Sequence, residues 1–247
     1  MPIFEFENYF YIIYAASFFS AIISASIGFI GGTVMLVVMA QFLRMEVLIP
    51  LHGMIQFISN SSRAYKLRQN INWKIGKESI IGALIGGVVG YFYLTPLPEK
   101  WFNLIIGLFI IFMTCVPKFR VNISWRGKWM LLGFISCSLG LFVGAIGILI
   151  GSFLLAENLE KKEMISTQAT LQSVIHFTKI VLFALLGFSL TPWILLVSGA
   201  MLCAYFGMLV GVKILDKIPQ KTFRFVVTSV VLILAARLVF MGFAEIF

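Results

Sequence analysis

The chain has 247 residues, of which 60% are apolar and only 12% are charged. A soluble chain of this length needs far more charge to cover its surface, so the composition excludes a soluble globular protein. The net charge of +9 does not indicate nucleic-acid binding, because the basic residues lie in short loops between apolar stretches and form no basic groove.

Apolar stretches follow one another along the whole chain. Residues 8–43 contain no Asp, Glu, Lys or Arg, and further apolar stretches cover 47–62, 78–97, 101–117, 127–156, 164–187, 190–213 and 222–243. About 20 apolar residues are enough for a helix to cross the bilayer. The sequence therefore predicts an all-α polytopic membrane protein without a soluble domain, and its N-terminus lacks the basic segment of a signal peptide.

The rare polar residues reveal an internal repeat at an offset of 116 residues. Gly28-Phe29-Ile30-Gly31 matches Gly144-Ala145-Ile146-Gly147 at this offset. The same offset relates four further pairs: His52 and Gln168, Gln56 and Gln172, Asn60 and His176, and Arg63 and Lys179. Weak internal symmetry of this kind is typical of transporters built from two repeats. We predict a first repeat over residues 1–123 and a second over 124–247, which together form one membrane domain.

Loop charges predict that the two repeats are inverted relative to each other. The loop after the stretch 47–62 is basic, whereas its counterpart at 187–192 is uncharged, and the next pair of loops reverses this pattern. Inverted repeats require an odd number of membrane crossings in each repeat, which here means about five segments. The stretches 8–43 and 127–156 must therefore each form a helical hairpin that is broken at its glycines. Each hairpin either crosses the membrane twice or re-enters on the same side.

Basic residues mark the cytoplasmic side of a membrane protein. The five-plus-five arrangement collects most of them on that side and places both termini outside, whereas an eight-helix arrangement splits the basic loops nearly evenly. The predicted cytoplasmic residues are Lys66, Arg68, Lys74, Lys77, Lys118, Arg120, Arg126, Lys128, Lys161, Lys162, Lys213, Lys217, Lys221 and Arg224.

Two stripes of polar residues form the candidate site. Spacings of three and four residues place each stripe on one helical face. Polar side chains in hydrocarbon are costly unless they face a partner, a cavity or water. Two alternative roles stay open: the amides join helices by hydrogen bonds, and Arg63 snorkels to the headgroups. The stripes are His52, Gln56, Asn60 and Arg63, and Gln168, Gln172, His176 and Lys179.

The glycine breaks indicate what charge the site accepts. A helix that starts inside the membrane offers free N–H groups and a positive dipole end, which favour an anion. The candidate glycines are Gly28, Gly31, Gly32, Gly144 and Gly147, for which close helix packing is the alternative role. No carboxylate is placed in the predicted membrane interior, which argues against a cation path. The sequence predicts no metal site, cofactor or catalytic residue.

These residues resemble the signatures of a known family. The resemblance rests on Pro50-Leu51-His52-Gly53-Met54-Ile55-Gln56, Ser59-Asn60-Ser61-Ser62-Arg63 and Ile71-Asn72-Trp73 in the first half, and on Gly144-Ala145-Ile146-Gly147, Thr167-Gln168-Ala169, Gln172, His176, Lys179-Ile180 and Gly187 in the second. Over essentially its full length the chain resembles the TauE/SafE family of sulfite and organosulfonate exporters, also called toluene sulfonate uptake permeases. The resemblance implies transport of sulfite, sulfoacetate or another organosulfonate across the plasma membrane, the inner membrane of a bacterium.

The leading hypothesis is a secondary transporter that moves such an anion by alternating access. A passive anion channel and a transporter of a different small organic anion are the alternatives. An enzyme is disfavoured because neither histidine has a carboxylate or nucleophile at readable spacing. Expected partners are a small anionic solute and the lipid bilayer, with no nucleic acid. Formation of a homo-oligomer and proton coupling through His176 stay open.

Overall fold

A computed structural model describes residues 8–28, 30–93, 99–115, 125–144, 146–157, 159–215 and 220–246. Within these ranges the chain forms α-helices and two 3₁₀ turns, Arg68–Asn70 and Thr191–Trp193, and no strand. The helices of the first half are α1 (Tyr9–Ile27), α2 (Gly31–Met39), α3 (Met45–Lys66), α4 (Trp73–Tyr93) and α5 (Glu99–Cys115). Those of the second half are α6 (Lys128–Val143), α7 (Gly147–Ala156), α8 (Lys161–Leu185), α9 (Ile194–Ile214) and α10 (Gln220–Ile246).

Several of these helices have the length and composition of membrane spans. Four described segments qualify: Tyr9–Ser26, Trp73–Tyr93, Lys161–Leu185 and Thr191–Ile214. The predicted all-helical, multi-pass membrane architecture is therefore confirmed. The helices α2 and α7 have only 9 and 10 residues, so each is about 15 Å long, half of the hydrocarbon thickness. Each follows a longer helix, which is the arrangement predicted for the stretches 8–43 and 127–156.

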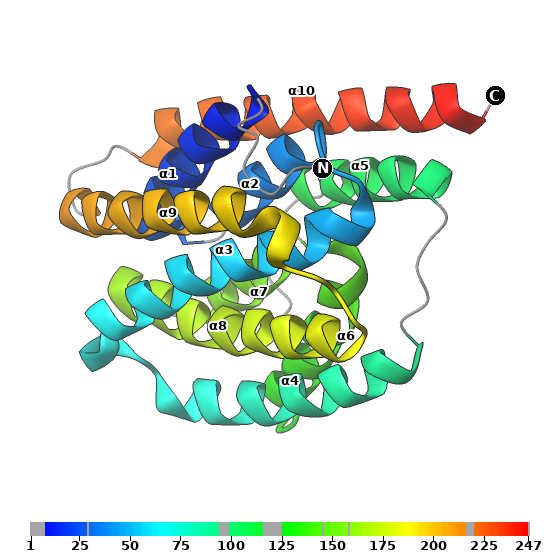
Figure 1. The fold of residues 1–247 in the computed structure, drawn as a ribbon. Coiled ribbons are helices and arrows are strands. Elements are labelled where there is room, and N and C mark those ends of the chain that lie inside the picture. The colour runs from blue at the N-terminus through cyan, green and yellow to red at the C-terminus, as the bar shows by residue number, and fades with distance from the viewer. Residues whose placement is uncertain are drawn as a thin grey trace.

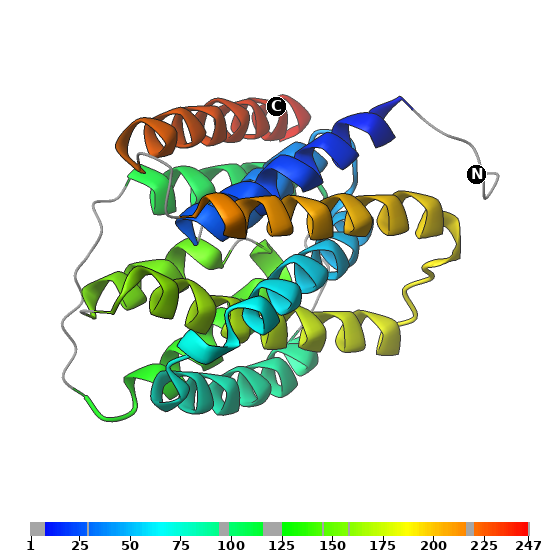
Figure 2. The ribbon, with the colours of Figure 1, turned by 90° about the vertical axis from the view of Figure 1, so that its left-hand side faces the viewer.

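The helices form layers in which the two sequence halves are interleaved. Figures 1 and 2 show α5 and α10 on one side, α4 on the opposite side, and α3 and α8 between them. The helix α1 packs along α9, and α4 packs along α6, so each of these pairs combines one helix from each half. The helices α3 and α8 also pack on each other, as do α5 and α10.

Two apolar clusters lie on either side of the α3–α8 contact. The first is built mainly from α1, α2, α5, α9, α10 and the beginning of α3. The second is built mainly from α4, α6, α7 and α8. Burial of apolar side chains therefore groups the helices differently from their order in the sequence, and the polar stripes of α3 and α8 lie where the two groups meet.

Glycines bring the interleaved helices into backbone contact. A Cβ at Gly86 in α4 would collide with the carbonyl oxygen of Phe134 in α6. A Cβ at Gly207 in α9 would collide in the same way with the carbonyl oxygen of Phe18 in α1. Small residues at such positions let helix backbones approach closely, which is how helices associate where lipid removes the hydrophobic driving force.

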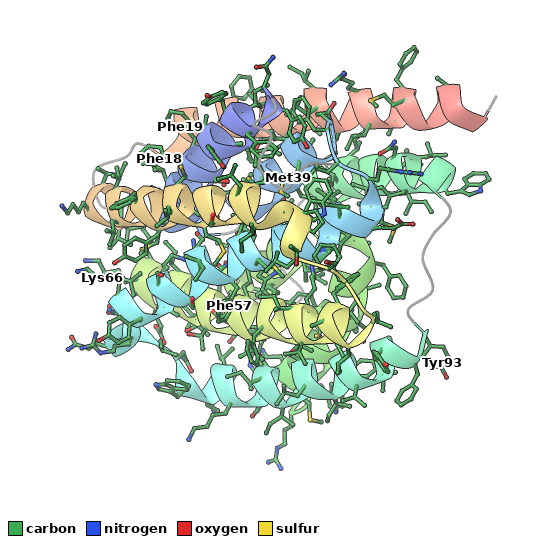
Figure 3. All side chains as sticks on the ribbon, in the orientation of Figure 1. Phe18, Phe19, Met39, Phe57, Lys66 and Tyr93 are labelled. Carbon is green, nitrogen blue, oxygen red and sulfur yellow. The ribbon has the colours of Figure 1, made fainter. Side chains whose placement is uncertain are left out.

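Polar contacts tie several connections together at one end of the molecule. Ser166 donates to the carbonyl oxygen of Asn70 at 2.8 Å, and Lys128 pairs with Glu157 at 2.5 Å. Lys161 donates to the carbonyl oxygen of Leu215. The start of α6, the 3₁₀ turn after α3, the segment before α8 and the end of α9 therefore share this end. Figure 3 shows Lys66 at the same end and Tyr93 at the opposite one.

This end carries most of the basic residues predicted to be cytoplasmic. Lys118, Arg120 and Lys217 lie outside the described residues, and nothing is described of the side chains of Lys221 and Arg224. The predicted boundary between residues 123 and 124 also lies outside the described residues.

Candidate functional site

The two predicted glycine breaks are present in the backbone. The helix α1 ends at Ile27 and is followed by Gly28 with φ 101°, and α6 ends at Val143 and is followed by Gly144 with φ 78°. A residue with a Cβ rarely adopts these angles, so both turns depend on glycine. New helices then begin at Gly31 and Gly147.

Each new helix is held by a side chain from a polar stripe. His52 Nε2 lies 2.9 Å from the carbonyl oxygen of Gly32, and Gln168 Nε2 donates to the carbonyl oxygen of Gly147 at 2.9 Å. His52 and Gln168 are related by the sequence offset of 116. The stripes of α3 and α8 are therefore attached to the first turns of α2 and α7, where the leading N–H groups have no partner within their own helix.

The stripe on α3 is buried along its whole length. Asn60 Nδ2 donates to the backbone oxygen of Gln56 at 2.8 Å, and Arg63 Nη2 donates to Asn60 Oδ1 at 2.5 Å. Arg63 has 0% exposure, so its guanidinium group does not snorkel out of the protein. Its Nε and Nη1 atoms have no hydrogen-bond partner among the described residues.

The stripe on α8 is buried as well and faces α3. The rings of His52 and His176 meet edge to face with centroids 5.7 Å apart. Lys179 is fully buried, and its stem crosses Gly53 so closely that a Cβ there would lie 3.0 Å from Lys179 Cδ. The ammonium group has no hydrogen-bond partner in the described part of the chain, although it lies near both histidines and Cys137.

The two breaks have different surroundings. A Cβ at Gly28 would meet Gln168 Oε1 at 3.4 Å, and one at Gly32 would meet Gln56 Oε1 at 3.5 Å. The first break therefore touches both stripes. Gly144 instead meets Leu36 and Ile49, which are aliphatic. The structure thus gathers the stripe residues and the first break around the α3–α8 contact, but leaves the Gly144 turn against apolar side chains.

The buried polar atoms without partners include nitrogen atoms of Arg63 and Lys179 that can only donate hydrogen bonds. A buried donor without a partner is costly, and a buried charge without a partner costs several kcal/mol. Such groups are expected where a ligand supplies the missing acceptor. In the described residues these atoms include the donors Arg63 Nε, Arg63 Nη1 and Lys179 Nζ, the hydroxyl oxygens of Thr33 and Ser59, the ring nitrogen His176 Nδ1, and the acceptors Gln168 Oε1 and His52 Nδ1, the latter because His52 Nε2–H donates to Gly32.

Sequence reasoning missed three residues near this site. Thr33 lies in the first turn of α2, and its position after Gly31 and Gly32 was a usable signal. Ser59 precedes Asn60 and is buried with an unpartnered hydroxyl. Cys137 on α6 approaches Lys179 only through tertiary packing, which no local pattern indicates.

An apolar groove lies outside the stripes, between α3, α8 and α9. It is lined by residues that include Met54, Phe57, Ile180, Val197 and Met201. A groove of this composition offers nothing to a charged solute and suits lipid. No group of three or more His, Cys, Asp or Glu residues that could hold a metal ion occurs in the described ranges.

Comparison with known proteins decides the family. The family model described as Sulfite exporter TauE/SafE matches residues 13–238, nearly the whole chain. The chain belongs to the TauE/SafE family. The resemblance seen in the sequence is confirmed, and TauE/SafE membership agrees with a multi-pass membrane protein that transports a small solute. No protein of curated function and no solved structure matches the chain significantly.

Proposed function

We propose that this TauE/SafE protein is a secondary transporter that moves a small sulfur-containing anion, such as sulfite, sulfoacetate or another organosulfonate, across the bacterial inner membrane by alternating access. The observation that carries the proposal is the burial of two cations without an acid. Arg63 and Lys179 have 0% exposure, and neither pairs with an acidic residue in the described part of the chain. Such charges are costly until an anion neutralises them.

The surroundings of the cations favour an oxyanion. Sulfite and sulfonate groups offer three oxygens that accept hydrogen bonds, and the unpartnered atoms of Arg63 and Lys179 are all donors. The first turn of α2 adds backbone N–H groups and the positive end of a helix dipole beside His52 and Gln56. We place the anion among the α3 stripe, the α8 stripe and the glycines Gly28, Gly31, Gly32 and Gly147, with Gly144 forming the second turn.

Helix directions support two inverted repeats. The helices α3 and α8 are matched by the offset of 116, and they run antiparallel: Ser166 at the start of α8 bonds Asn70 beyond the end of α3, whereas His52 near the start of α3 meets His176 far along α8. The antiparallel course of these two matched helices is what an inverted topology of the repeats predicts.

The packing of the outer helices repeats in the same way. Gly86 meets Phe134 between α4 and α6, and Gly207 meets Phe18 between α9 and α1. Phe18 and Phe134 are related by the offset of 116, and Gly86 and Gly207 by 121. The same contact therefore recurs with the two halves exchanged, which supports repeats over residues 1–123 and 124–247.

Alternating access then requires two bodies that move against each other. We assign α1, α2, α3, α5, α9 and α10 to one body and α4, α6, α7 and α8 to the other, following the two apolar clusters. The largest contact between these bodies is the one between α3 and α8, so the anion site lies where the motion would open it. Each body contains helices from both repeats, because α9 packs on α1 and α4 packs on α6.

We propose that the end carrying the basic residues faces the cytoplasm and that both termini are outside. The basic loops lie at one end of the molecule, where polar contacts join them. The positive-inside rule assigns such loops to the cytoplasmic side. Coupling to protons through His176 and formation of a homo-oligomer stay predictions. Comparing sulfite flux with and without a pH gradient tests the first.

Counterflow in liposomes tests the proposed function. Vesicles loaded with unlabelled sulfite should accumulate labelled sulfite transiently, and the rate should saturate with concentration. Gln172→Ala, in the stripe, should lower this flux at least about tenfold, because one lost hydrogen bond to a charged ligand is worth that much. Ser173→Ala is the matched control, since the Ser173 hydroxyl bonds its own helix at Ala169. Flux without saturation or counterflow would establish a channel instead.

A further inference from the structure

A second cavity lies at the basic end of the molecule, away from the contact between α3 and α8. Its volume is about 570 Å³, which is within the range of cavities that bind small organic ligands. Its walls come from the start of α4, from the start of α6 with the residues just before it, and from the segment after α7. The charged side chains that line it are Lys74, Glu78, Arg126, Lys128 and Glu157.

One ion pair in this cavity is already formed, and two cations are left over. Lys128 pairs with Glu157 at 2.5 Å, so these two charges satisfy each other. The side chains of Lys74 and Arg126 are exposed and make no ion pair or hydrogen bond with another described residue. Three basic and two acidic side chains, Glu78 included, leave the lining with one net positive charge. One monovalent anion would therefore balance the cavity.

The cavity lies at the depth of the lipid headgroups. The helix α4 has the length and hydropathy of a membrane span from Trp73 to Tyr93, and Lys74 is in its first turn. Trp73 and Trp125 are exposed beside the cavity, and tryptophan is enriched where the bilayer meets water. Phospholipid phosphates lie at this same depth, so they are the anions that Lys74 and Arg126 meet at the highest local concentration.

We propose that this cavity binds the headgroup of an anionic phospholipid of the phosphatidylglycerol type, whose phosphodiester carries one negative charge. Lys74 and Arg126 bind the phosphate oxygens, and the guanidinium group can donate two parallel hydrogen bonds to them. Glu78 accepts a hydrogen bond from a headgroup hydroxyl, and Trp125 packs on the glycerol and the upper acyl chain. Basic pockets between membrane helices are the usual sites of such headgroups. The site does not depend on the solute bound between α3 and α8.

Lipid binding to the purified full-length chain tests the proposal. The protein in detergent is titrated with phosphatidylglycerol and with phosphatidylcholine of identical acyl chains, and native mass spectrometry counts the bound lipids. Both lipids carry the phosphodiester, but the choline group adds a positive charge that opposes Lys74 and Arg126. Phosphatidylglycerol should therefore bind at least about fivefold more tightly. Inorganic phosphate, added in a separate titration, distinguishes a free anion from a lipid.

Substitutions then connect the preference to the cavity. Lys74→Gln and Arg126→Gln should each lower the affinity for phosphatidylglycerol about fivefold, because each removes one basic contact with the phosphate. Lys77→Gln is the matched control: it removes the same charge one turn later on α4, from an exposed side chain outside the cavity lining. Its affinity for phosphatidylglycerol should stay that of the unmodified chain. A cooperative thermal transition in each variant confirms that it is folded.

A preference for phosphatidylglycerol that is lost in Lys74→Gln and Arg126→Gln but kept in Lys77→Gln would support the site. Equal binding of phosphatidylcholine by the unmodified chain would overturn it. An equal loss in Lys77→Gln would also overturn it, because the attraction would then belong to the whole basic surface. Inorganic phosphate that displaces the lipid at the same concentration would assign the cavity to a free anion and overturn the lipid.

Discussion

Replacing Lys179 by methionine removes the buried ammonium group and keeps a flexible, unbranched side chain over Gly53. The lysine is fully buried, and its Nζ has no partner among the described residues. Methionine fills a similar volume without a charge to desolvate. We therefore expect Lys179→Met to stabilise the protein in the absence of ligand and to abolish its response to sulfur anions.

The expected gain follows from the cost of an unpaired buried charge. That cost is several kcal/mol per ion after relaxation of the surroundings. We expect a net stabilisation of about 2 kcal/mol. For a chain of this size each kcal/mol shifts Tm by about 2–4 °C, so Tm without ligand should rise by about 4–8 °C.

The assay is thermal unfolding of the purified protein with and without sulfite or a sulfonate. The unmodified chain should melt at a higher temperature with ligand, because binding to the folded state stabilises it by mass action. Lys179→Met should melt at one temperature in both conditions. Lys66→Met is the matched control: the residue is exposed, so its Tm should change little and its response to ligand should persist.

A fall in the Tm of Lys179→Met without ligand would refute the reasoning. It would mean that the ammonium group is already neutralised or hydrogen-bonded within the protein and does not need a bound anion. A full response to ligand in this variant would place the anion elsewhere.

Three further predictions concern the glycine breaks, the proposed motion between α3 and α8, and the orientation in the membrane. In thermal unfolding, Gly28→Ala should destabilise the fold by more than Gly187→Ala. Both glycines have a positive φ, at which a residue with a Cβ costs about 1–2 kcal/mol, but only at Gly28 would the Cβ also meet neighbouring atoms within 4 Å. The rings of Phe57 on α3 and Phe177 on α8 lie 5.7 Å apart. Cysteines at both positions, joined by a short bifunctional reagent, should stop sulfite flux, whereas either cysteine alone should not. Flux that survives the cross-link would rule out motion at this contact. A cysteine in place of Arg68 should react with a membrane-impermeant reagent only in inside-out vesicles. A cysteine in place of Gly187 should react only in right-side-out vesicles. The reverse result would mean that the protein has the opposite orientation in the membrane.

Much of the site was predictable from spacing. Glycine is the residue that accepts φ near 100° without strain, so the turns at Gly28 and Gly144 could be located from the residue pattern. Polar residues three and four apart must share a helical face, and so His52 and Gln56 on α3 could be assigned to one stripe. Polar groups are rare in this chain, and each therefore carries information.

The arrangement of the helices around the site could not be predicted in this way. Lipid is as apolar as leucine, so an apolar face does not reveal which helix covers it. Only the tertiary structure decides that α1 packs on α9 and α4 on α6, across the two halves. It alone places Cys137 near Lys179 and surrounds Gly144 with Leu36 and Ile49.

The sequence by itself determined that the chain is a helical membrane protein, where its helices break, and which residues form the two polar stripes. These properties depend on local hydropathy, on backbone angles and on helical periodicity. Only the tertiary structure decided that both cations are buried without an acid among the described residues and that the stripes meet between two apolar clusters of helices. Burial and pairing depend on residues far apart in the chain, such as His52 and His176, and local patterns do not encode such contacts.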